Sequence, residues 1–360
     1  MNSVSGVASN GMLVNAENEW SPLKAVIVGR AEHSCYPNAP QHLMGAIMPR
    51  HYLERFRPHS PFSPEIVKNA QKELDRFACV LQQYGVKVYR PDEVDWLKHG
   101  GYTGAMPRDR LMTVGNRLIE SIPAWDCRQK EIELAYSTIM SQFSHPEEAG
   151  WHVFRQPVLH GRNTIHDGKE EWCFDPDRDW AVNDSRPAFD AADFMRFGKY
   201  IIGQPSHVTN QKGIDYLRAM LPAEYTLEII KPEYPSVMHI DATLLPLRKG
   251  LLVYNPTHIG EGALRQLKAL EGWEMHAYHL PKNPARNPNL PNPEQPIVSG
   301  WIVLNGLSLD EKHIFLEEQS TDLAEWIKDK FGMEPILLPF KHVNSLGGSF
   351  HCATVDLVRD

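Results

Sequence analysis

The sequence lacks the features that would place it in a membrane or a secretory pathway. It contains no run of 18 apolar residues, so it predicts no membrane-spanning helix. Residues 1–18 are polar and small, without a basic segment followed by an apolar run, and so do not predict a signal peptide. We expect them to form a flexible N-terminal arm.

Cysteine is scarce and scattered. The five cysteines form no Cys-X-X-Cys pair, which argues against a disulfide framework or a zinc ribbon. This usage favours a reducing compartment, so we expect a cytoplasmic protein. Glycine-rich phosphate-binding motifs are missing, and the histidines show no metal-ligand spacing, so we expect neither a cofactor nor a metal.

An excess of positive charge is also missing. The chain has 37 Lys and Arg against 45 Asp and Glu, a net charge of −8, and its pI is near 6.1. This balance predicts no binding of nucleic acid or of an anionic membrane. A hydrophobic content of 42% and a charged content of 23% are ordinary for a soluble globular enzyme. The mild acidity suits a small cationic substrate.

What the sequence does contain is a recurring order of elements, in which helices are the clearest part. Ser63 followed by Pro64 predicts a capped helix start, and apolar residues then recur at helical spacing until Gly85. Further helices are predicted at about 129–143, 209–221, 260–271 and 320–331, the last ending on Gly332.

A short strand-like run follows each helix, and a hairpin-like double run follows each strand. The single runs are rich in β-branched and aromatic residues, and the hairpins carry Gly or Asn near their middle. The single runs are Val86–Pro91, Trp151–Pro157, Thr226–Pro232, Trp273–Pro281 and Glu334–Phe340. The first four hairpins are Arg110–Ser121, Phe194–Gly203, Thr243–Asn255 and Trp301–Glu318. The fifth would pair Ala353–Val358 with Lys24–Val28.

The order of strand, hairpin and helix therefore occurs five times, with the last unit closed by the two ends of the chain. A repeating unit closed on itself indicates an α/β ring or propeller with five pseudosymmetric blades. The same order also fits an α/β sheet without symmetry, and the pattern alone does not decide between the two.

Residues able to do chemistry recur at one place in the repeat, just before or at the first hairpin strand. In a ring of equivalent units, these positions converge on the axis and share one pocket. The residues are Asp109, Asp190, Asp193, His239, Asp241, Ser299 and Cys352.

The residue types in this set predict a particular reaction. A cysteine thiolate is a nucleophile, and a histidine near neutral pH can take and return a proton. One carboxylate can orient that histidine, and further carboxylates suit a planar guanidinium. The set therefore predicts nucleophilic attack on a guanidinium or amidinium carbon.

Each of these residues also has a purely structural interpretation. Cys352 fits a small buried apolar residue, His239 a core histidine and Asp190 the cap of a local turn. Asp193 could pair with Arg196. Their recurrence at one position of the repeat favours a shared site.

Several longer motifs carry a resemblance to a known family. They are FDAADF (189–194), MHIDAT (238–243), LDEK (309–312), LGGSFHCAT (346–354), MPRD (106–109) and PAWDCR (123–128). Together they resemble the glycine and inosamine-phosphate amidinotransferases, which belong to the pentein superfamily of guanidino-modifying enzymes. The resemblance extends from Asn18–Leu23 to Cys352–Asp356, nearly the whole chain.

This resemblance implies a fold and a set of roles. It implies one catalytic domain over residues 19–360, a five-bladed α/β propeller of the pentein type. It makes Cys352 the nucleophile, His239 the general acid and base, and Asp190 the third member of the triad. Further residues are implied to bind substrate: Asp109 and Asp241 at the guanidinium, Met238 and Ser299 along the pocket, with Asp193 of the FDAAD motif added to them.

One position departs from the family pattern. Family members usually carry an arginine shortly after the Asn-Pro that ends the third hairpin, where it holds the substrate α-carboxylate. His258 occupies that place here. A neutral histidine cannot form the same two-pronged grip on a carboxylate. Either another basic residue substitutes for the arginine, or donor and acceptor recognition at His258 differ from those of the glycine enzyme, so the acceptor stays open.

The expected reaction is a ping-pong transfer of the amidino group of L-arginine through Cys352 to an acceptor amine, releasing L-ornithine. The acceptor could be glycine, lysine or an amine of a specialised natural-product pathway, and the resemblance leaves a homodimer open. Two alternatives stay open as well. One is a hydrolase of the arginine deiminase or dihydrolase type, and the other is a non-catalytic arginine-binding protein.

Overall fold

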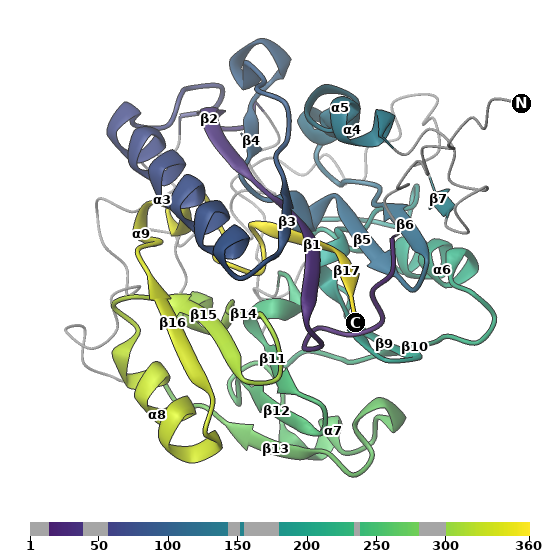
Figure 1. The fold of residues 1–360 in the computed structure, drawn as a ribbon. Helices are drawn as coiled ribbons and strands as arrows, with labels where there is room; N and C mark the ends of the chain where they lie inside the picture. The colour runs from purple at the N-terminus through teal and green to yellow at the C-terminus, as the bar shows by residue number, and fades with distance from the viewer. Residues whose placement is uncertain (1–13, 39–56, 143–151, 155–179, 234–237, 281–299) are drawn as a thin grey trace, which may run out of the picture.

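The computed structural model describes residues 14–38, 57–142, 152–154, 180–233, 238–280 and 300–360 (Figure 1). Helices and strands alternate along these segments, which confirms the α/β class. No helix in these segments is both long enough and apolar enough to cross a lipid bilayer.

The described strands form five separate three-stranded sheets of one construction, plus a two-stranded pair. In each three-stranded sheet, the central strand pairs antiparallel with one neighbour and parallel with the other. Four sheets follow one another along the chain: β5 (Leu111–Val114), β6 (Arg117–Glu120) and β7 (His152–Phe154); β8 (Phe194–Phe197), β9 (Tyr200–Gly203) and β10 (Thr226–Ile229); β11 (Leu244–Arg248), β12 (Leu251–Tyr254) and β13 (Glu274–Ala277); β14 (Leu307–Ser308), β15 (His313–Glu317) and β16 (Glu334–Leu338).

The fifth sheet joins the two ends of the chain, as predicted. β17 (Thr354–Arg359) pairs antiparallel with β1 (Leu23–Val28), and β1 pairs parallel with β3 (Lys87–Tyr89). Figure 1 shows β17 and β1 side by side although they lie at opposite ends of the sequence. The chain-end strands therefore complete a unit equivalent to the other four.

The helices follow the predicted positions with three differences. α3 (Pro64–Gln83) begins on the predicted proline, but the Ser63 side chain makes no capping hydrogen bond, so its predicted capping role is wrong. The helix predicted at 129–143 is two short ones, α4 (Glu131–Ala135) and α5 (Ser137–Ser141). The one predicted at 260–271 is α7 (Glu261–Leu264) followed by the 3-10 turn η6 (Lys268–Leu270). The other two are α6 (Gln211–Met220) and α8 (Thr321–Phe331), and Gly332 ends α8 in the left-handed conformation.

Some elements carried too weak a pattern to be predicted. β2 (Arg30–Cys35) pairs with β4 (Tyr102–Gly104), and α9 (Lys341–Asn344) is a single turn. Another 3-10 turn, η1 (Trp96–His99), precedes β4. The first part of the hairpin predicted at 301–318 is also a 3-10 turn, η8 (Gly300–Leu304), so only β14 and β15 pair there.

The core beside α3 is a cluster of aromatic rings. The Phe77 ring lies 5.0 Å from Phe315, 5.5 Å from Phe340 and 5.0 Å from Phe350, edge to face in each case. All four side chains are fully buried. Such contacts add about 0.5–1.5 kcal/mol per pair beyond the burial itself. Because Phe350 lies two residues before Cys352, this cluster anchors the loop that carries the cysteine.

A second buried feature is a set of charged side chains that we call the arginine network: Glu19, Arg108, Arg196, Asp356 and Arg359. All of them are at most 4% exposed. Asp356 accepts hydrogen bonds from all three arginines, and the guanidinium of Arg196 donates two bonds to Glu19. Arg196 is therefore the partner of Glu19 and Asp356, which replaces the structural alternative that paired it with Asp193.

The N-terminal segment is held in place from residue 14 onward. Val14 and Ala16 are fully buried, and backbone bridges join Asn15 to Val358, Ala16 to Gly115 and Asn18 to Phe197. The predicted boundary of the arm at residue 18 is thus too late, because backbone pairing along three sheets anchors residues 14–18. Residues 1–13 lie outside the described residues.

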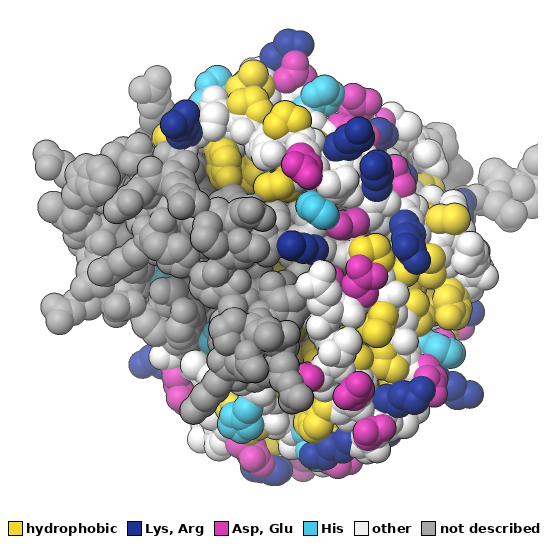
Figure 2. Space-filling model, turned by 90° about the vertical axis from the view of Figure 1, so that its left-hand side faces the viewer, with side chains coloured by type: hydrophobic (Ala, Val, Ile, Leu, Met, Phe, Trp, Pro, Cys, Tyr) yellow, Lys and Arg dark blue, Asp and Glu magenta, His cyan; other side chains and the backbone are white. Residues whose placement is uncertain are grey.

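Acidic and basic side chains are interspersed on the described part of the face drawn in Figure 2. This mixture agrees with a net charge that is only moderately negative.

Asp356→Ala is expected to lower the free energy of unfolding by about 3–5 kcal/mol, because it leaves three buried arginines short of a counter-charge. Urea denaturation measures this. The control is Lys24→Ala, which breaks the exposed Lys24–Asp360 pair and should cost at most about 1 kcal/mol. Equal costs for the two variants would contradict a stabilising role of the arginine network.

The difference in the free energy of unfolding between wild type and Asp356→Ala should also depend on pH. Burial alone would raise the pKa of Asp356, but Arg359, Arg108 and Arg196 outweigh it and hold the pKa below the ordinary value. The stability that Asp356 contributes is therefore complete above about pH 4 and is lost as the pH falls toward the depressed pKa. The difference between wild type and Asp356→Ala should shrink over that acidic range.

Candidate active site

Three short 3-10 turns bring the predicted aspartates together. η2 (Pro107–Asp109), η4 (Ala191–Asp193) and η5 (Ile240–Ala242) lie at the starts of β5, β8 and β11. η2 contacts η4, η4 contacts η5, and η5 contacts η8. Equivalent positions of four units thus lie next to one another, as the repeat predicted.

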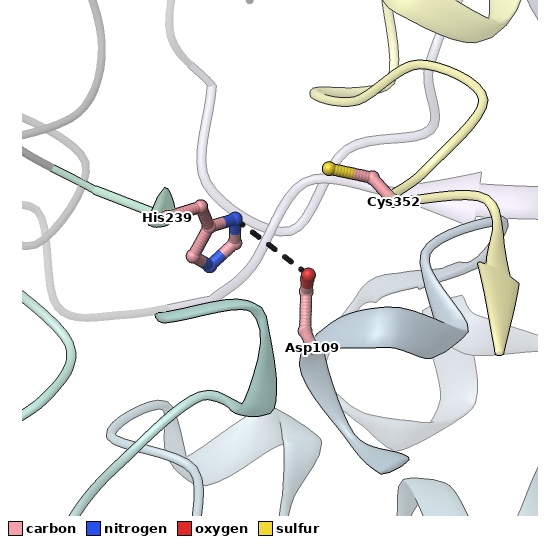
Figure 3. Close-up of side chains that lie close together, drawn as sticks. All are labelled: Asp109, His239 and Cys352. Atoms are coloured by element: carbon pink, nitrogen blue, oxygen red, sulfur yellow. Dashed lines mark ion pairs between the residues drawn. The ribbon is translucent and has the colours of Figure 1, made fainter. Parts of the chain in front are cut away.

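Cys352, His239 and Asp109 face one another across a shared space (Figure 3). Their sulfur, nitrogen and oxygen atoms lie within 4.8 Å of one another, and all three residues are buried. His239 Nε2 is 3.2 Å from Asp190 Oδ2, and His239 Nδ1 is 3.7 Å from Asp109 Oδ1. Four of the predicted site residues therefore meet, although up to 243 positions separate them in the chain.

Asp193 lies next to His239, and protein groups bind both of its carboxylate oxygens. Its Oδ1 accepts hydrogen bonds from Gln204 Nε2 and from the His239 backbone N–H, at 3.1 and 3.0 Å. Its Oδ2 accepts from the hydroxyls of Ser206 and Thr209. It is fully buried, and burial raises its pKa to about 6. Protein donors bind both oxygens, so the described contacts of Asp193 are with its own chain, and its contact with substrate stays a prediction.

What Asp193 positions is a strained residue. His239 has a backbone φ of +61°, which few residues other than glycine adopt, and such strain gathers at functional sites. The bond from its N–H to Asp193 holds this conformation and aims the imidazole at Asp190.

The electrostatics of the site favour a charged histidine and a neutral thiol. Burial alone would lower the pKa of His239, but Asp109, then Asp190 and Cys352, raise it well above its ordinary value. Burial and the charge of Asp241 raise the pKa of the Cys352 thiol to about 12. Without a further cation nearby, the sulfur therefore keeps its proton.

The sulfur itself has two close hydrogen-bond partners. Cys352 Sγ lies 3.3 Å from Asp241 Oδ2, to which the thiol donates, and 3.2 Å from Asn305 Nδ2. The loop beneath it requires glycine at 348, because a Cβ there would lie 2.5 Å from both Cys352 Cβ and Met106 Sδ. Gly348 therefore allows the loop to pack closely against Cys352.

Asp241 is held by a histidine that the sequence prediction left without a role. His351 Nδ1 lies 2.8 Å from Asp241 Oδ2, and His351 Nε2 lies 3.2 Å from Glu19 Oε2. Burial and Arg108 lower the pKa of His351, but Asp241 and Glu19 outweigh them and raise it. Burial alone would raise the pKa of Asp241, and His351 instead lowers it, so Asp241 stays ionised.

Arg128 binds one oxygen of Asp109, as His351 binds one oxygen of Asp241, but burial still raises the pKa of Asp109. Arg128 Nη1 donates to Asp109 Oδ2 at 2.6 Å, and the same guanidinium is paired with Glu131 and lies over the Tyr102 ring. The PAWDCR motif that ends on Arg128 was a sequence signal for this position. Nothing in the sequence pointed to Glu19 or Asn305 as neighbours of the site.

Three carboxylate oxygens of the site have no hydrogen-bond partner among the described residues. They are Asp109 Oδ1, Asp190 Oδ1 and Asp241 Oδ1, and all are buried. A buried acceptor without a donor is costly, so these atoms indicate the place of a ligand rich in N–H groups.

The same three residues drawn in Figure 3 bear on metal binding. In the part of the chain that the structure describes, Asp109, His239 and Cys352 are the group whose atoms lie close enough to hold a metal ion. The expectation of no metal and no cofactor stays a prediction.

Three predicted site residues remain: Met238, His258 and Ser299. Met238 is half-buried next to His239. His258 Nδ1 lies 2.9 Å from Thr243 Oγ1, and burial lowers the pKa of His258 to about 4, so its imidazole is neutral. Ser299 lies outside the described residues.

The chain is similar in sequence to several amidinotransferases, although no family model matches it. It is 38% identical over 355 residues to the L-arginine:L-lysine amidinotransferase of Pseudomonas savastanoi pv. phaseolicola, which covers 95% of this chain and 93% of that protein. It is 32% identical to the mitochondrial glycine amidinotransferase of Xenopus tropicalis, over 99% of this chain and 85% of that one.

Solved structures give the same result. An amidinotransferase from the saxitoxin pathway of Microseira wollei superposes with a TM-score of 0.82 at 33% identity, and the inosamine-phosphate amidinotransferase of Streptomyces griseus with 0.79 at 28%. Each match covers 96% of this chain and 97% of the other. Dimethylarginine dimethylaminohydrolase of Pseudomonas aeruginosa, at 14% identity and a TM-score of 0.57, shares the fold.

Asp241→Asn is expected to speed the alkylation of Cys352 by iodoacetamide at pH 8. The negative charge of Asp241 raises the pKa of the thiol, and removing a neighbouring charge of this kind shifts a pKa by about 1–3 units. Mass spectrometry of the peptide that contains Cys352 gives the rate. Asp310→Asn, in the turn before β15, is the control and should leave the rate unchanged. A slower rate in Asp241→Asn would contradict this electrostatic interpretation.

Proposed function

The chain belongs to the amidinotransferase family, and we propose that it transfers the amidino group of L-arginine to an acceptor amine and releases L-ornithine. One observation carries the proposal: a buried cysteine and histidine lie beside three carboxylate oxygens that have no hydrogen-bond partner. A guanidinium offers five N–H donors in one plane, which is the partner that such acceptors require.

We propose that Asp109 and Asp241 bind the guanidinium through their Oδ1 atoms. Their Oδ2 atoms are held by Arg128 and His351, at 2.6 and 2.8 Å, so each carboxylate is fixed before substrate arrives. Fixed acceptors lose little entropy when they bind, and they place the guanidino carbon near Cys352.

Binding of the cation also activates the nucleophile. The charge of Asp241 raises the pKa of Cys352, and a guanidinium bound to Asp241 compensates that charge. The pKa of the thiol then falls, its proton is lost to solvent, and the thiolate attacks the guanidino carbon to form a C–S bond. His239, held protonated by Asp109 and Asp190, gives its proton to the departing nitrogen as the C–N bond breaks, and ornithine leaves.

The second half of the reaction reverses the proton transfers. The acceptor amine attacks the amidino carbon on Cys352, and neutral His239 takes a proton from that amine. The C–S bond breaks, and the thiolate of Cys352 is restored. The bond between His239 Nε2 and Asp190 orients the ring throughout both halves.

We also propose that residues 19–360 form one domain in which the five sheets surround a common axis as a closed ring. The contacts of η2 with η4, η4 with η5 and η5 with η8, and of β17 with β5, support this order. The aromatic cluster of Phe77, Phe315 and Phe350 supports contact between the fourth and fifth sheets.

The acceptor amine is the open part of the proposal. A neutral His258 stands where family members carry an arginine, so a carboxylate held there by charge is not expected in this protein. Lysine is the first acceptor to test, because the relative at 38% identity is named for it, and glycine and natural-product amines follow.

The assembly and the compartment also remain proposals. We propose a homodimer in the cytoplasm that binds neither nucleic acid nor membranes, on the grounds of family resemblance, scattered cysteines and net charge.

Incubation with L-arginine and a panel of amines should give ornithine and one guanidino product, identified by its mass. Cys352→Ser should abolish the product, whereas Cys79→Ser, which changes an exposed cysteine on α3, should leave it unchanged. Citrulline formed without any amine would support a hydrolase instead. Arginine bound but never consumed would support a binding protein.

With arginine alone, Cys352 is expected to gain the mass of one amidino group. Double-reciprocal plots of rate against arginine, at several fixed concentrations of the acceptor amine, should be parallel. His239→Gln should lower kcat by about 100-fold or more, because general acid–base catalysis contributes about 10²–10⁴-fold. Intersecting plots without an adduct would refute a covalent intermediate.

A further inference from the structure

Asn305 contacts the sulfur of Cys352, although no sequence motif pointed to it. It follows η8 and precedes β14, and only 1% of it is exposed. Its Nδ2 lies 3.2 Å from Cys352 Sγ, within the range of a hydrogen bond to sulfur.

The orientation of this amide follows from its other contacts. Asn305 Oδ1 accepts hydrogen bonds from the backbone N–H groups of Ser349 and Cys352, both at 3.1 Å. Rotating the amide by 180° would place its NH₂ group against these two donors. The Nδ2 group therefore faces the sulfur and donates to it.

We propose that Asn305 is a further catalytic residue of the amidino transfer, whose side-chain N–H stabilises the thiolate of Cys352. This inference rests on the proposed function, in which Cys352 attacks as a thiolate. It assigns to Asn305 a contact with the reacting atom itself.

The surroundings of the sulfur explain why such a donor matters. Asp241 Oδ2, 3.3 Å away, accepts a hydrogen bond from the thiol but repels the thiolate. His239 is a charged neighbour that must give up its proton during the reaction, whereas Asn305 is neutral and cannot titrate. Its N–H therefore stabilises the thiolate in both halves of the reaction, as attacking group and as leaving group.

The size of the effect follows from two opposing trends. A hydrogen bond to a charged group lowers a thiol pKa by about one to two units. A thiolate of lower pKa is more abundant but less nucleophilic, with a Brønsted slope of about 0.4–0.5. Losing the donor should therefore slow attack by about threefold to tenfold at a pH well below the thiol pKa.

A purely structural role makes a different prediction for Asn305. Its Oδ1 also holds the loop of residues 349–352, and its backbone carbonyl accepts from the N–H of His351 at 3.3 Å. Asn305→Asp keeps an oxygen for the two backbone donors but places an acidic group against the sulfur. Asn305→Ala removes both the acceptor and the donor.

The test is the rate of Cys352 alkylation by iodoacetamide between pH 7 and 9, followed by mass in the full-length chain. We expect rates about threefold to tenfold lower in Asn305→Ala and lower still in Asn305→Asp. A carboxylate at 305 repels the thiolate in either case, so Asn305→Ala is the deciding variant: if the Asn305 N–H does not stabilise the thiolate, Asn305→Ala should be alkylated at least as fast as wild type, and the proposal is overturned.

The matched control is Asn210→Asp. Asn210 is a buried asparagine whose Oδ1 also accepts two backbone N–H groups, from Ala188 and Gly213, and whose Nδ2 donates to the carbonyls of Asn183 and Arg186. In Asn210→Asp, the alkylation rate of Cys352 should equal that of wild type. A loss equal to that of Asn305→Asp would trace the effect to burying any new carboxylate and would overturn the proposal.

A second measurement leaves Asn305 unchanged. In protein labelled with ¹⁵N-asparagine, one side-chain amide resonance should differ between wild type and Cys352→Ala, because that amide donates to sulfur. Identical amide spectra would show that no asparagine donates to Cys352, which would overturn the proposal even if both Asn305 variants failed to fold.

Neither measurement depends on turnover, so the two proposals fail separately. Slower alkylation in a protein that yields no guanidino product would refute the proposed function and leave the Asn305–sulfur bond standing. A guanidino product together with an unchanged alkylation rate in both Asn305 variants would support the proposed function and refute the role of Asn305.

Discussion

The burial of several carboxylates around one sulfur atom is the constraint on which the rest of this structure depends. Asp109, Asp190 and Asp241 stand beside His239 and Cys352 with little access to water. Buried negative charges are costly unless positive charge or N–H donors compensate them. Arg128, His239 and His351 bind one oxygen of Asp109, Asp190 and Asp241 respectively, and the other oxygen of each carboxylate has no hydrogen-bond partner among the described residues.

Buried charged and aromatic side chains around the site hold these carboxylates and Cys352 in place. Glu19 pairs with both His351 and Arg196, so the arginine network is continuous with the partner of Asp241. Asp356 lies on β17, the strand that follows Cys352, and accepts hydrogen bonds from three arginines. β17, which follows Cys352, pairs with β1, and the aromatic cluster around Phe350 packs next to the loop that carries the cysteine.

Particular elements show where sequence patterns were sufficient. Glycines at the hairpin turns, such as Gly198 and Gly250, adopt the positive φ that such turns require, and the pairing of β17 with β1 was predicted by pattern alone. The pattern failed at 301–304, where an apolar run forms a 3-10 turn, and at 260–271, where one predicted helix is two short pieces. Apolar runs of this length fit several local structures, and tertiary contacts decide among them.

By itself, the sequence determined the α/β class, the order of the repeated units and the residue types of the site, since all three depend on local periodicity and side-chain chemistry. Tertiary structure alone decided which of those side chains touch. It placed Asp193 against the backbone N–H of His239, and it brought Glu19 to His351 and Asn305 to Cys352. The physical reason is that burial, charge compensation and hydrogen bonding act between residues that the chain separates by 46 to 332 positions.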